Sequence, residues 1–372
     1  MIIGVNARLL YSEKLEGISR YIYETTKEMA INHPEDLFIL YHDRPITHPF
    51  NFPPNIIQKV VWLPTRHPIL WWLWFEWLLP LRLKKDKVDV FYSGDGYLSL
   101  RSKLPTLMVT HDLAYLHYPK HLGWAIRTYY QYYIPKFHVR ANTIIAVSKT
   151  TKEDIIQRFG LKEDKIVIAY NSVRELPSIN PTQIRFNILE IVNQKTPYFL
   201  FVGALHPRKN IVKMCHAFTH FKQNQDLPCK LIIAGRHAWK SDSIQKAMDT
   251  DSDIIYLGSI NEDEKQFLLK NASAMLYISL FEGFGIPILE AFNSKTPVIT
   301  SNVSSMPEVA GNAGILVDPN DIEEISIALG EVLKQNLRKQ LIEKGQQRLN
   351  LFSWKTSANK IYQSLLHIKN NP

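Results

Sequence analysis

The sequence predicts an α/β protein made of two doubly wound domains, each with a parallel sheet covered by helices on both faces. The length of 372 residues accommodates two domains at about 150 residues per domain. Short apolar and β-branched runs alternate with helix-length segments, and this alternation occurs in both halves of the chain. The runs are apolar throughout rather than at every second position, which is typical of parallel strands buried on both faces.

Each half of the chain contains its own series of predicted strands. In the first half we expect strands at residues 2–7, 37–42, 60–63, 88–93, 106–112, 143–148 and 165–170. In the second half we expect them at residues 198–204, 229–235, 254–259, 274–279, 297–301 and 314–318. Strands that alternate with helices in this way form βαβ units and parallel sheets.

The boundary between the domains is expected between residues 174 and 197. Residues 174–187 contain two prolines and show no strong periodicity, as is typical of a linker. We therefore assign residues 1–175 to the first domain and residues 195–350 to the second. The segment 353–370 is expected to form a further helix, because a serine at its start is a suitable N-cap and apolar residues recur on one face.

Composition and charge exclude some classes of protein. Hydrophobic residues make up 45% and charged residues 21% of the chain, which is ordinary for a globular protein. Cys215 and Cys229 are expected to be reduced and packed, and no cysteine–histidine cluster suggests a structural metal. The N-terminus lacks the pattern of a secretory signal, so we expect a cytoplasmic protein. The net charge of +9 favours anionic partners, but the basic residues are scattered, so nucleic acid is not an expected partner.

Residues 69–83 form a tryptophan-rich segment that holds four of the eight tryptophans of the chain. The segment is too short to span a membrane, and Glu76 and Pro80 interrupt it. One interpretation is a packed helix that precedes the next strand. The other is an interfacial surface over residues 69–87, with tryptophans at headgroup depth and basic residues that meet acidic lipid. Both interpretations hold if they concern different faces of the segment.

Three groups of residues carry the candidate chemistry, and the first follows the strand at 198–204. Arg208 and Lys209 stand in the loop between this strand and a helix that we expect to begin near Asn210. Ligands of open α/β sheets bind at the carboxyl ends of the strands. Two cations beside the free N–H groups of a helix N-terminus suit a diphosphate. The alternative is a pair of solvated surface cations.

The second group is the stretch 279–292, which is the most informative part of the sequence. A strand leads into Glu282, two glycines follow, and a helix is expected to start around Pro287. Glycines let the backbone approach a ligand closely, and proline suits the first turn of a helix. Glu290 lies one turn into that helix, and we expect both glutamates to face the same cleft.

The third group, His111 and Asp112, ends the predicted strand at 106–112. The pair is either structural or part of a site at the carboxyl edge of the first sheet. After the first strand, Gly17 begins another loop that leads into a helix.

Together these segments resemble the family 4 glycosyltransferases, which are retaining enzymes of the GT-B fold. The matching segments extend over nearly the whole chain and are residues 15–24, 109–119, 146–155, 202–211, 231–240, 256–292 and 304–319. The most specific match is the pair of glutamates separated by seven residues in a glycine and proline context. The GT-B fold implies two Rossmann-like domains facing a central cleft, where the nucleotide-sugar donor binds, and a final helix that crosses back onto the first domain.

The resemblance implies roles for the matching residues near the reacting sugar. Arg208 and Lys209 are expected to bind the donor diphosphate. Glu282 is expected to lie near the sugar hydroxyls. The backbone of Gly283, Phe284 and Gly285 is expected to donate toward the sugar or the phosphate.

The resemblance also implies roles at the nucleotide and on the first domain. Glu290 is expected to contact the ribose of the nucleotide, and Ser259 and Ile260 match the loop whose backbone lines the base pocket. His111 is expected to touch the sugar near the reaction centre. Gly17 is expected where the N-terminal loop approaches the phosphates.

The donor is a co-substrate, and no cofactor or metal is expected if the two cations neutralise the diphosphate. A rival interpretation is a metal-dependent, single-domain glycosyltransferase, because Asp249, Asp251 and Asp253 supply an Asp-x-Asp motif. A solvated loop is the other interpretation of these aspartates. Two further classes are a sugar-nucleotide epimerase of the same fold and a non-catalytic scaffold.

The substrate is inferred from the same resemblance. Residues 15–24, 207–210 and 304–319 look most like members that transfer mannose from GDP-mannose in the assembly of lipopolysaccharide or other surface polysaccharides. UDP-linked hexoses or N-acetylhexosamines are the alternative donors. The acceptor is expected to be lipid-linked or an oligosaccharide. The tryptophan-rich segment and the basic surface place the expected enzyme at the inner face of the plasma membrane, as a peripheral protein.

Overall fold

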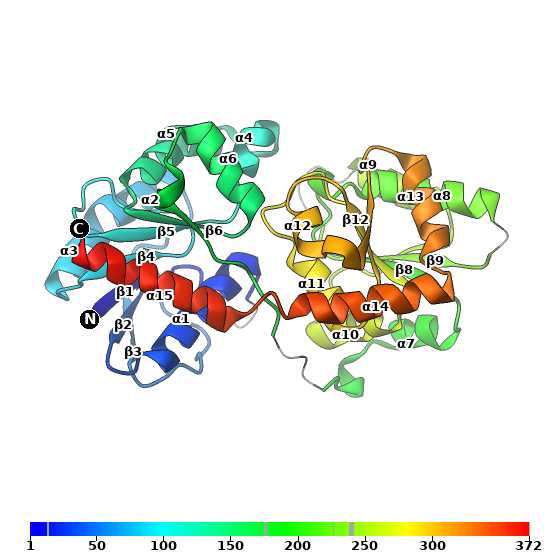
Figure 1. Cartoon of the computed structure of the whole chain (residues 1–372), viewed down its shortest axis with the longest axis horizontal. Helices are drawn as coiled ribbons and strands as arrows, with labels where there is room; N and C mark the ends of the chain where they lie inside the picture. Colours follow the sequence, from blue (N-terminus) through cyan, green and yellow to red (C-terminus); the bar gives the residue numbers. More distant parts are fainter. Residues whose placement is uncertain (13–14, 175, 177, 226, 238–241, 372) are drawn as a thin grey trace. The chain divides into compact units, whose positions relative to one another are not determined.

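The computed structural model describes residues 1–12, 15–174, 176, 178–225, 227–237 and 242–371. The chain divides into two compact units, one formed by Met1–Asn171 and Ser353–Pro372 and the other by Ser172–Phe352. Each unit contains a parallel sheet with helices on both faces (Figure 1). The predicted α/β class with two doubly wound sheets is therefore confirmed.

The first unit is built on a seven-stranded sheet with the strand order β3-β2-β1-β4-β5-β6-β7. All neighbouring strands run parallel. The strands are β1 (Ile2–Asn6), β2 (Leu37–His42), β3 (Ile56–Val60), β4 (Val90–Ser93), β5 (Thr106–Thr110), β6 (Thr143–Ala146) and β7 (Ile166–Ile168). The strand order reverses direction at β1, so the sheet is doubly wound.

Helices cover both faces of this first sheet. The helices are α1 (Gly17–Asn32), α2 (Pro68–Leu73), the π-helical turn η1 (Trp74–Leu78), α3 (Leu79–Lys85), α4 (Ala114–His117), η2 (Pro119–His121), α5 (Trp124–Arg140), α6 (Lys149–Phe159), η3 (Glu163–Lys165) and α15 (Trp354–Asn370). The last helix, α15, packs against α1, β4 and β5, and Figure 1 shows it in red across this unit. Its Ser353 accepts a bond from the backbone N–H of Thr356, as expected of an N-cap.

The second unit repeats the architecture with six parallel strands in the order β10-β9-β8-β11-β12-β13. The strands are β8 (Tyr198–Val202), β9 (Lys230–Ala234), β10 (Ile254–Tyr256), β11 (Ala274–Tyr277), β12 (Val298–Ser301) and β13 (Gly314–Val317). The helices are η4 (Pro181–Gln183), α7 (Phe186–Asn193), η5 (Pro207–Lys209), α8 (Ile211–Asn224), α9 (Asp242–Met248), α10 (Glu262–Asn271), α11 (Ile286–Asn293), α12 (Met306–Ala310), η6 (Gly311–Ala313), α13 (Ile322–Glu331) and α14 (Gln335–Leu349).

The third strand of the first sheet differs from its prediction. We predicted residues 60–63, but β3 spans Ile56–Val60 and only Val60 is shared. β3 is the edge strand of the sheet, and Gln58 and Lys59 within it are exposed or half-buried. Because an edge strand is solvated on one side, it lacks the continuous apolar run that identified the other strands.

The tryptophan-rich segment is helical, but it is not one regular helix. It runs through α2, the π-helical turn η1 and α3. Trp71 and Trp74 are buried in the core of the first unit, whereas Trp72 and Trp77 are exposed. Packed and exposed tryptophans thus occur in the same segment.

The division between the units falls earlier than the predicted boundary region. It lies between Asn171 and Ser172, and the predicted linker belongs to the second unit. Arg174 pairs with Glu262, and Arg185 pairs with Glu264, which is 2% exposed. These ion pairs attach Arg174 and the start of α7 to α10, and the local sequence composition gives no sign of them.

Candidate functional site

The first two candidate residues lie on a short turn between β8 and α8. In η5, the ring of His206 accepts a bond from the N–H of Arg208. Asn210 then adopts the left-handed conformation, with φ of 61°, and α8 begins at the next residue, as predicted. The side-chain amide of Asn210 donates to the carbonyl of Pro319 at 2.7 Å. The turn is therefore fixed from both sides, and it holds Arg208 and Lys209 at the carboxyl edge of the second sheet.

Glu282, on the loop after the neighbouring strand β11, binds both cations. Its Oε2 lies 2.9 Å from Nη1 of Arg208, and its Oε1 lies 2.6 Å from Nζ of Lys209. The Glu282 side chain is 9% exposed and the Lys209 side chain 14% exposed, so little water screens this pair. The sequence predicted that these residues lie at the carboxyl ends of strands, but it did not predict the ion pairs between them.

Burial and charge oppose each other in this cluster, and charge prevails. Burial would raise the pKa of Glu282, but Lys209 and Arg208 outweigh it and lower that pKa. Burial would lower the pKa of Lys209, but Glu282 outweighs it and raises that pKa. All three groups are therefore charged near neutral pH, and two cations against one carboxylate leave a net positive charge.

Tyr277, at the end of β11, also belongs to this cluster, and the sequence analysis missed it. Nζ of Lys209 donates to the Tyr277 hydroxyl at 3.0 Å and lies 4.9 Å from the centre of its ring. Burial is the main reason why the pKa of Tyr277 is raised to about 12, so the hydroxyl stays protonated. A buried tyrosine at a strand end resembles an ordinary core residue in sequence, which is why no signal identified it.

Two serines, Ser304 and Ser305, hold the loop from Glu282 to Gly285. They begin the segment 304–319, which resembles the family but to which we assigned no role in the site. Oγ of Ser304 donates to the Glu282 carbonyl at 2.7 Å, and Oγ of Ser305 donates to the carbonyls of Glu282 and Phe284. Gly285 has φ of 105°, which strains any other residue, and it precedes α11 directly. The prediction that a helix starts around Pro287 is confirmed, since α11 begins at Ile286.

Glu290 lies in a second polar group, together with the loop before α10. Its Oε1 is 2.7 Å from Nζ of Lys265, a residue that the sequence analysis did not identify. Ser259 is exposed, and its carbonyl accepts a bond from Arg185 at 3.2 Å. Ile260 follows Ser259, and a capping box starts α10 at the next residue. The backbone of the loop at Ser259 and Ile260 is therefore held in place. The loop lies a few residues before Lys265, the partner of Glu290.

His111 and Asp112 lie at the carboxyl end of β5 in the first unit, although the strand stops at Thr110 and does not include them as predicted. Nε2 of His111 lies 2.8 Å from the Gly94 carbonyl, and since a carbonyl only accepts, this nitrogen carries the proton. Burial lowers the pKa of His111, so the ring is neutral at pH 7. Oδ1 of Asp112 accepts from the N–H of Ala114 at 3.0 Å, which is a local structural role at the start of α4.

Gly17 is the first residue of α1 and is exposed. A Cβ atom added there meets no described atom within 4 Å. The described chain therefore does not itself require glycine at this position. This agrees with, but does not test, the prediction that a ligand approaches the backbone there.

A buried ion pair at the carboxyl edge of the first sheet was not predicted. Nε of Arg8 lies 2.5 Å from Oδ2 of Asp95, and Oδ1 of Asp95 accepts from Asn6 at 2.6 Å. The Arg8 guanidinium also lies 4.3 Å from the ring centre of Tyr97. The residues are separated by almost ninety positions, so only the pairing of β1 with β4 brings them together.

The aspartates of the rival metal interpretation have other partners. Asp249 accepts from Gln245 at 2.9 Å, and Asp251 and Asp253 both pair with Lys222. They precede β10 and so lie at its amino end, away from the edge where open α/β sheets bind ligands. Their arrangement is that of a structural turn.

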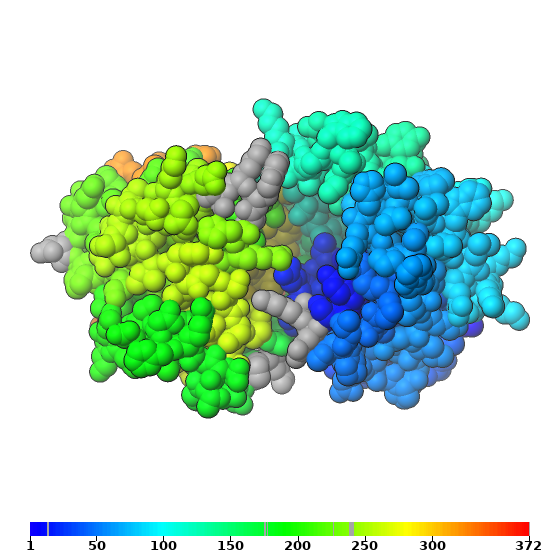
Figure 2. Space-filling model, turned by 180° about the vertical axis from the view of Figure 1, so that it is seen from behind, coloured from blue at the N-terminus to red at the C-terminus, as the bar shows by residue number. Residues whose placement is uncertain are grey.

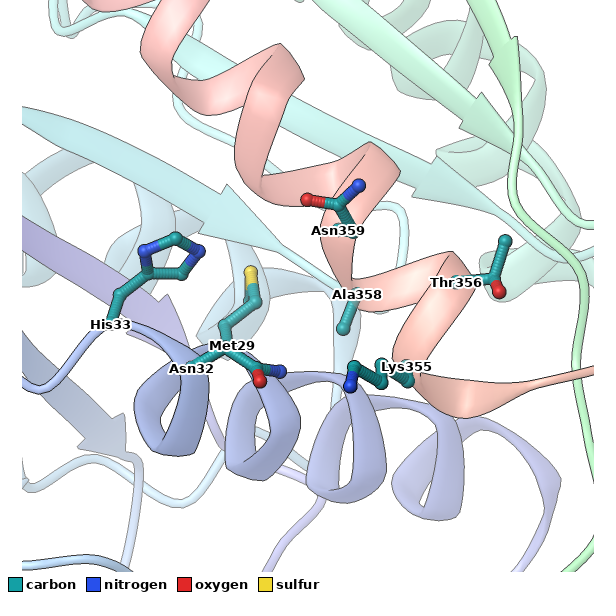
Figure 3. Close-up of a pocket in the computed structure, with 7 residues that line it drawn as sticks. All are labelled: Met29, Asn32, His33, Lys355, Thr356, Ala358 and Asn359. Carbon is teal, nitrogen blue, oxygen red and sulfur yellow. The ribbon is translucent and has the colours of Figure 1, made fainter.

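A hollow of about 460 Å³ lies on the first unit between α1 and α15 (Figure 3). Its lining residues are Met29, Asn32, His33, Lys355, Thr356, Ala358 and Asn359. Figure 3 shows side chains of both helices pointing toward this space. None of the predicted site residues lines it, so the candidate site is the cluster around Glu282 and not this hollow.

Two parallel-sheet α/β units in one chain, with cations at the carboxyl edge of the second sheet, are the architecture of the GT-B fold. Among solved structures the chain is similar to WaaG, a glycosyltransferase involved in lipopolysaccharide biosynthesis. The TM-score is 0.69 at 16% identity, over 98% of this chain and 99% of that chain. At this identity the likeness concerns the fold alone.

The chain belongs to the family 4 glycosyltransferases. Residues 15–175 match the model described as Glycosyltransferase Family 4, and residues 186–348 match the model described as Glycosyl transferases group 1. The protein is therefore a hexosyltransferase. Positions 238–240 of the segment 231–240 that carried the resemblance lie outside the described residues.

Two curated relatives are bacterial mannosyltransferases. O-antigen chain mannosyltransferase B of Escherichia coli is 26% identical over 375 residues, which cover 93% of this chain and 94% of the relative. O-antigen chain mannosyltransferase RfbU of Salmonella typhimurium (strain LT2) is 29% identical, over 72% of each chain. Among the described residues, no helix has the length and apolar character needed to cross a membrane.

Proposed function

We propose that the protein transfers mannose from GDP-mannose to a lipid-linked or oligosaccharide acceptor, with retention of the anomeric configuration, in the assembly of a surface polysaccharide. The observation that carries the proposal is the cluster of Arg208, Lys209 and Glu282 at the carboxyl edge of the second sheet. A net positive, poorly solvated cluster suits a diphosphate. The names of the two mannosyltransferase relatives support the choice of sugar.

In this proposal the step that most requires stabilisation by the protein is the departure of the nucleoside diphosphate from the donor. The bond between the anomeric carbon and the β-phosphate oxygen breaks, and negative charge grows on that phosphate. Arg208 and Lys209 stabilise this charge, which is where fixed cations accelerate a reaction most. The acceptor hydroxyl attacks from the same face, and its proton passes to the departing phosphate. No residue is assigned as a covalent nucleophile, and no metal is required.

The remaining predicted site residues hold the donor. Glu282 accepts bonds from sugar hydroxyls, and the backbone of Gly283–Gly285 donates toward the sugar or the phosphate. Glu290 binds the ribose hydroxyls. Ser259 and Ile260 line the pocket for the base. The positions of Glu290 and of the loop before α10 support these assignments, because Lys265 joins α10 to Glu290.

His111 and Gly17 are assigned to the sugar and to the phosphates respectively. A neutral His111 whose Nε2 is bonded to Gly94 has Nδ1 as its acceptor, which suits a sugar hydroxyl. Both assignments follow from the family resemblance. The reaction is proposed to take place at the cytoplasmic face of the membrane, where a lipid-linked acceptor is available.

A panel of donors tests the proposed function. GDP-mannose, UDP-glucose and UDP-N-acetylglucosamine are compared by thermal shift and by donor turnover, with and without an acceptor, in excess chelator. A donor at 100 times its dissociation constant stabilises the fold by about 2.7 kcal/mol, so the correct one stands out. Stabilisation by a UDP-sugar alone would identify the alternative donor. Conversion of the sugar nucleotide without acceptor would indicate an epimerase, and loss of turnover in chelator would contradict metal independence.

A further inference from the structure

The π-helical turn within the tryptophan-rich segment brings two exposed tryptophans together. In a regular α-helix, residues five positions apart point in clearly different directions. The wider turn over Trp74–Leu78 aligns Trp72 with Trp77, and their ring centres lie 6.5 Å apart. Trp71 and Trp74 point the other way, and their indole N–H groups donate to the carbonyls of Thr65 and Val61. The segment thus has a packed face and an exposed face.

The exposed face carries five large apolar side chains, which we call the aromatic stripe. Its members and their exposed fractions are Ile69 at 62%, Trp72 at 36%, Trp77 at 43%, Leu78 at 36% and Leu81 at 67%. Leu81 in α3 is four positions after Trp77 in η1, so the two lie on one face of this helical segment. Figure 2 shows the segment that contains α2 and α3, in lighter blue, at the surface of the first unit. Large side chains exposed together in this way mark a binding surface.

The charge around the aromatic stripe is positive. Lys84 and Lys85 are exposed one turn beyond Leu81. The acidic residues of the segment 66–87 are Glu76 and Asp86, and both are engaged. Asp86 pairs with Lys59 and Arg82, while Glu76 is 5% exposed.

Glu76 has a further effect on this surface. Its carboxylate accepts bonds from the Ser99 hydroxyl and from the N–H groups of Leu100 and Arg101 at 3.0 to 3.1 Å. This fixes the loop after β4, and the Arg101 guanidinium lies 3.6 Å from the ring centre of Trp77. The residue that interrupts the apolar run therefore places another cation over the aromatic stripe.

We infer that the aromatic stripe, with Lys84, Lys85 and Arg101, docks on a membrane that contains anionic lipids. Tryptophans are enriched at the headgroup level of membranes, and cations beside them meet acidic headgroups. Within the segment 66–87 both acidic residues are engaged, while Lys84 and Lys85 are exposed, and this favours a lipid surface of opposite charge. The inference extends the proposed function, because it names the surface on which a lipid-linked acceptor is met.

Vesicle binding tests the inference on the full chain. The parent is expected to co-sediment with vesicles of phosphatidylcholine and phosphatidylglycerol in equal parts, and only weakly with phosphatidylcholine alone. The variant Trp72→Glu/Leu81→Glu loses the insertion of two large apolar side chains and is expected to bind about a hundredfold more weakly. The variant Lys84→Ala/Lys85→Ala is expected to lose about thirtyfold, since each cation near an anionic surface contributes about one kcal/mol.

Phe186→Glu is the matched control, because Phe186 is 80% exposed but lies on α7 in the second unit. It should bind vesicles like the parent. The exposed positions of Trp72 and Leu81 let their variants fold, so their thermal midpoints and their donor turnover with a water-soluble acceptor should match those of the parent.

Three results would overturn the inference. The parent could fail to bind anionic vesicles, or the Trp72→Glu/Leu81→Glu variant could bind them as well as the parent. Alternatively, light scattering could show a dimer that this variant converts to a monomer with unchanged vesicle binding, which would identify a second copy of the chain as the partner. Absence of donor turnover in the parent would contradict the proposed function but leave the vesicle result standing.

Discussion

Replacing Lys209 by methionine separates the structural role of the charge cluster from its proposed role in binding the donor. The Lys209 ammonium lies 2.6 Å from Oε1 of Glu282, in a pair whose side chains are 14% and 9% exposed. Removal of one partner of a buried pair costs about 3 to 5 kcal/mol of the free energy of unfolding. We expect about 3 kcal/mol, at the lower end, because Arg208 still holds Oε2 at 2.9 Å.

The same replacement is expected to reduce the rate far more than stability alone explains. Loss of one group that stabilises transition-state charge lowers the turnover number by about 10²–10³-fold. The double variant Lys209→Met/Glu282→Gln removes the stranded carboxylate. We expect it to recover most of the free energy of unfolding but none of the rate, since the phosphate still lacks its cation.

Urea unfolding and donor turnover are measured on the parent, on Lys209→Met, on Glu282→Gln and on the double variant. Lys213→Met is the control, because Lys213 lies four positions after Lys209, in α8, and its ammonium group donates to Asn320 at the surface. It should change neither quantity. If the double variant recovered both the stability and the rate, Lys209 would serve only to neutralise Glu282, and its assignment to the diphosphate would be wrong.

Three further predictions concern neighbouring side chains. Glu290→Gln should raise the donor KM about tenfold or more with a smaller change in kcat, because a charged hydrogen bond to the ribose is lost; an unchanged KM in steady-state kinetics would contradict that contact. As the pH rises, GDP affinity falls when Lys209 loses its proton, and in Glu282→Gln this fall should begin at a lower pH than in the parent. The reason is that Glu282 raises the pKa of Lys209, whereas burial alone lowers it. Calorimetry from neutral to alkaline pH checks this prediction, and coincident pH profiles of the two proteins would refute it. Tyr277→Phe removes the acceptor of Lys209 and should weaken GDP binding about fivefold, in line with about 1 kcal/mol for one hydrogen bond; equal affinity in the same titration would show that Tyr277 does not position Lys209.

The parts of the fold that were predictable from sequence are those governed by burial. Central parallel strands are buried on both faces, so β1, β5 and β11 appear as uninterrupted apolar runs. The edge strand β3 contains the exposed Gln58 and the half-buried Lys59, and it was predicted too late in the chain. The π-helical turn was not predictable. The type of a helix is inferred from the spacing of its apolar and polar residues, and this segment is almost wholly apolar.

The candidate site was predictable where topology brings strand ends together. Arg208 and Glu282 are 74 positions apart, but β8 and β11 are neighbours, so loops after both strands meet. The detailed partners were not predictable. Tyr277 resembles a core residue, Lys265 resembles a surface lysine, and Glu76 finds its partners in a loop more than twenty residues later. Such contacts depend on tertiary packing, which no local pattern encodes.

A crystal structure of the protein with bound GDP tests the central claim most directly. The account predicts the two phosphates within hydrogen-bond distance of Arg208 and Lys209 and the ribose hydroxyls at the Glu290 carboxylate. Phosphates bound elsewhere, with Arg208 and Lys209 still paired to Glu282 as in the free protein, would contradict it.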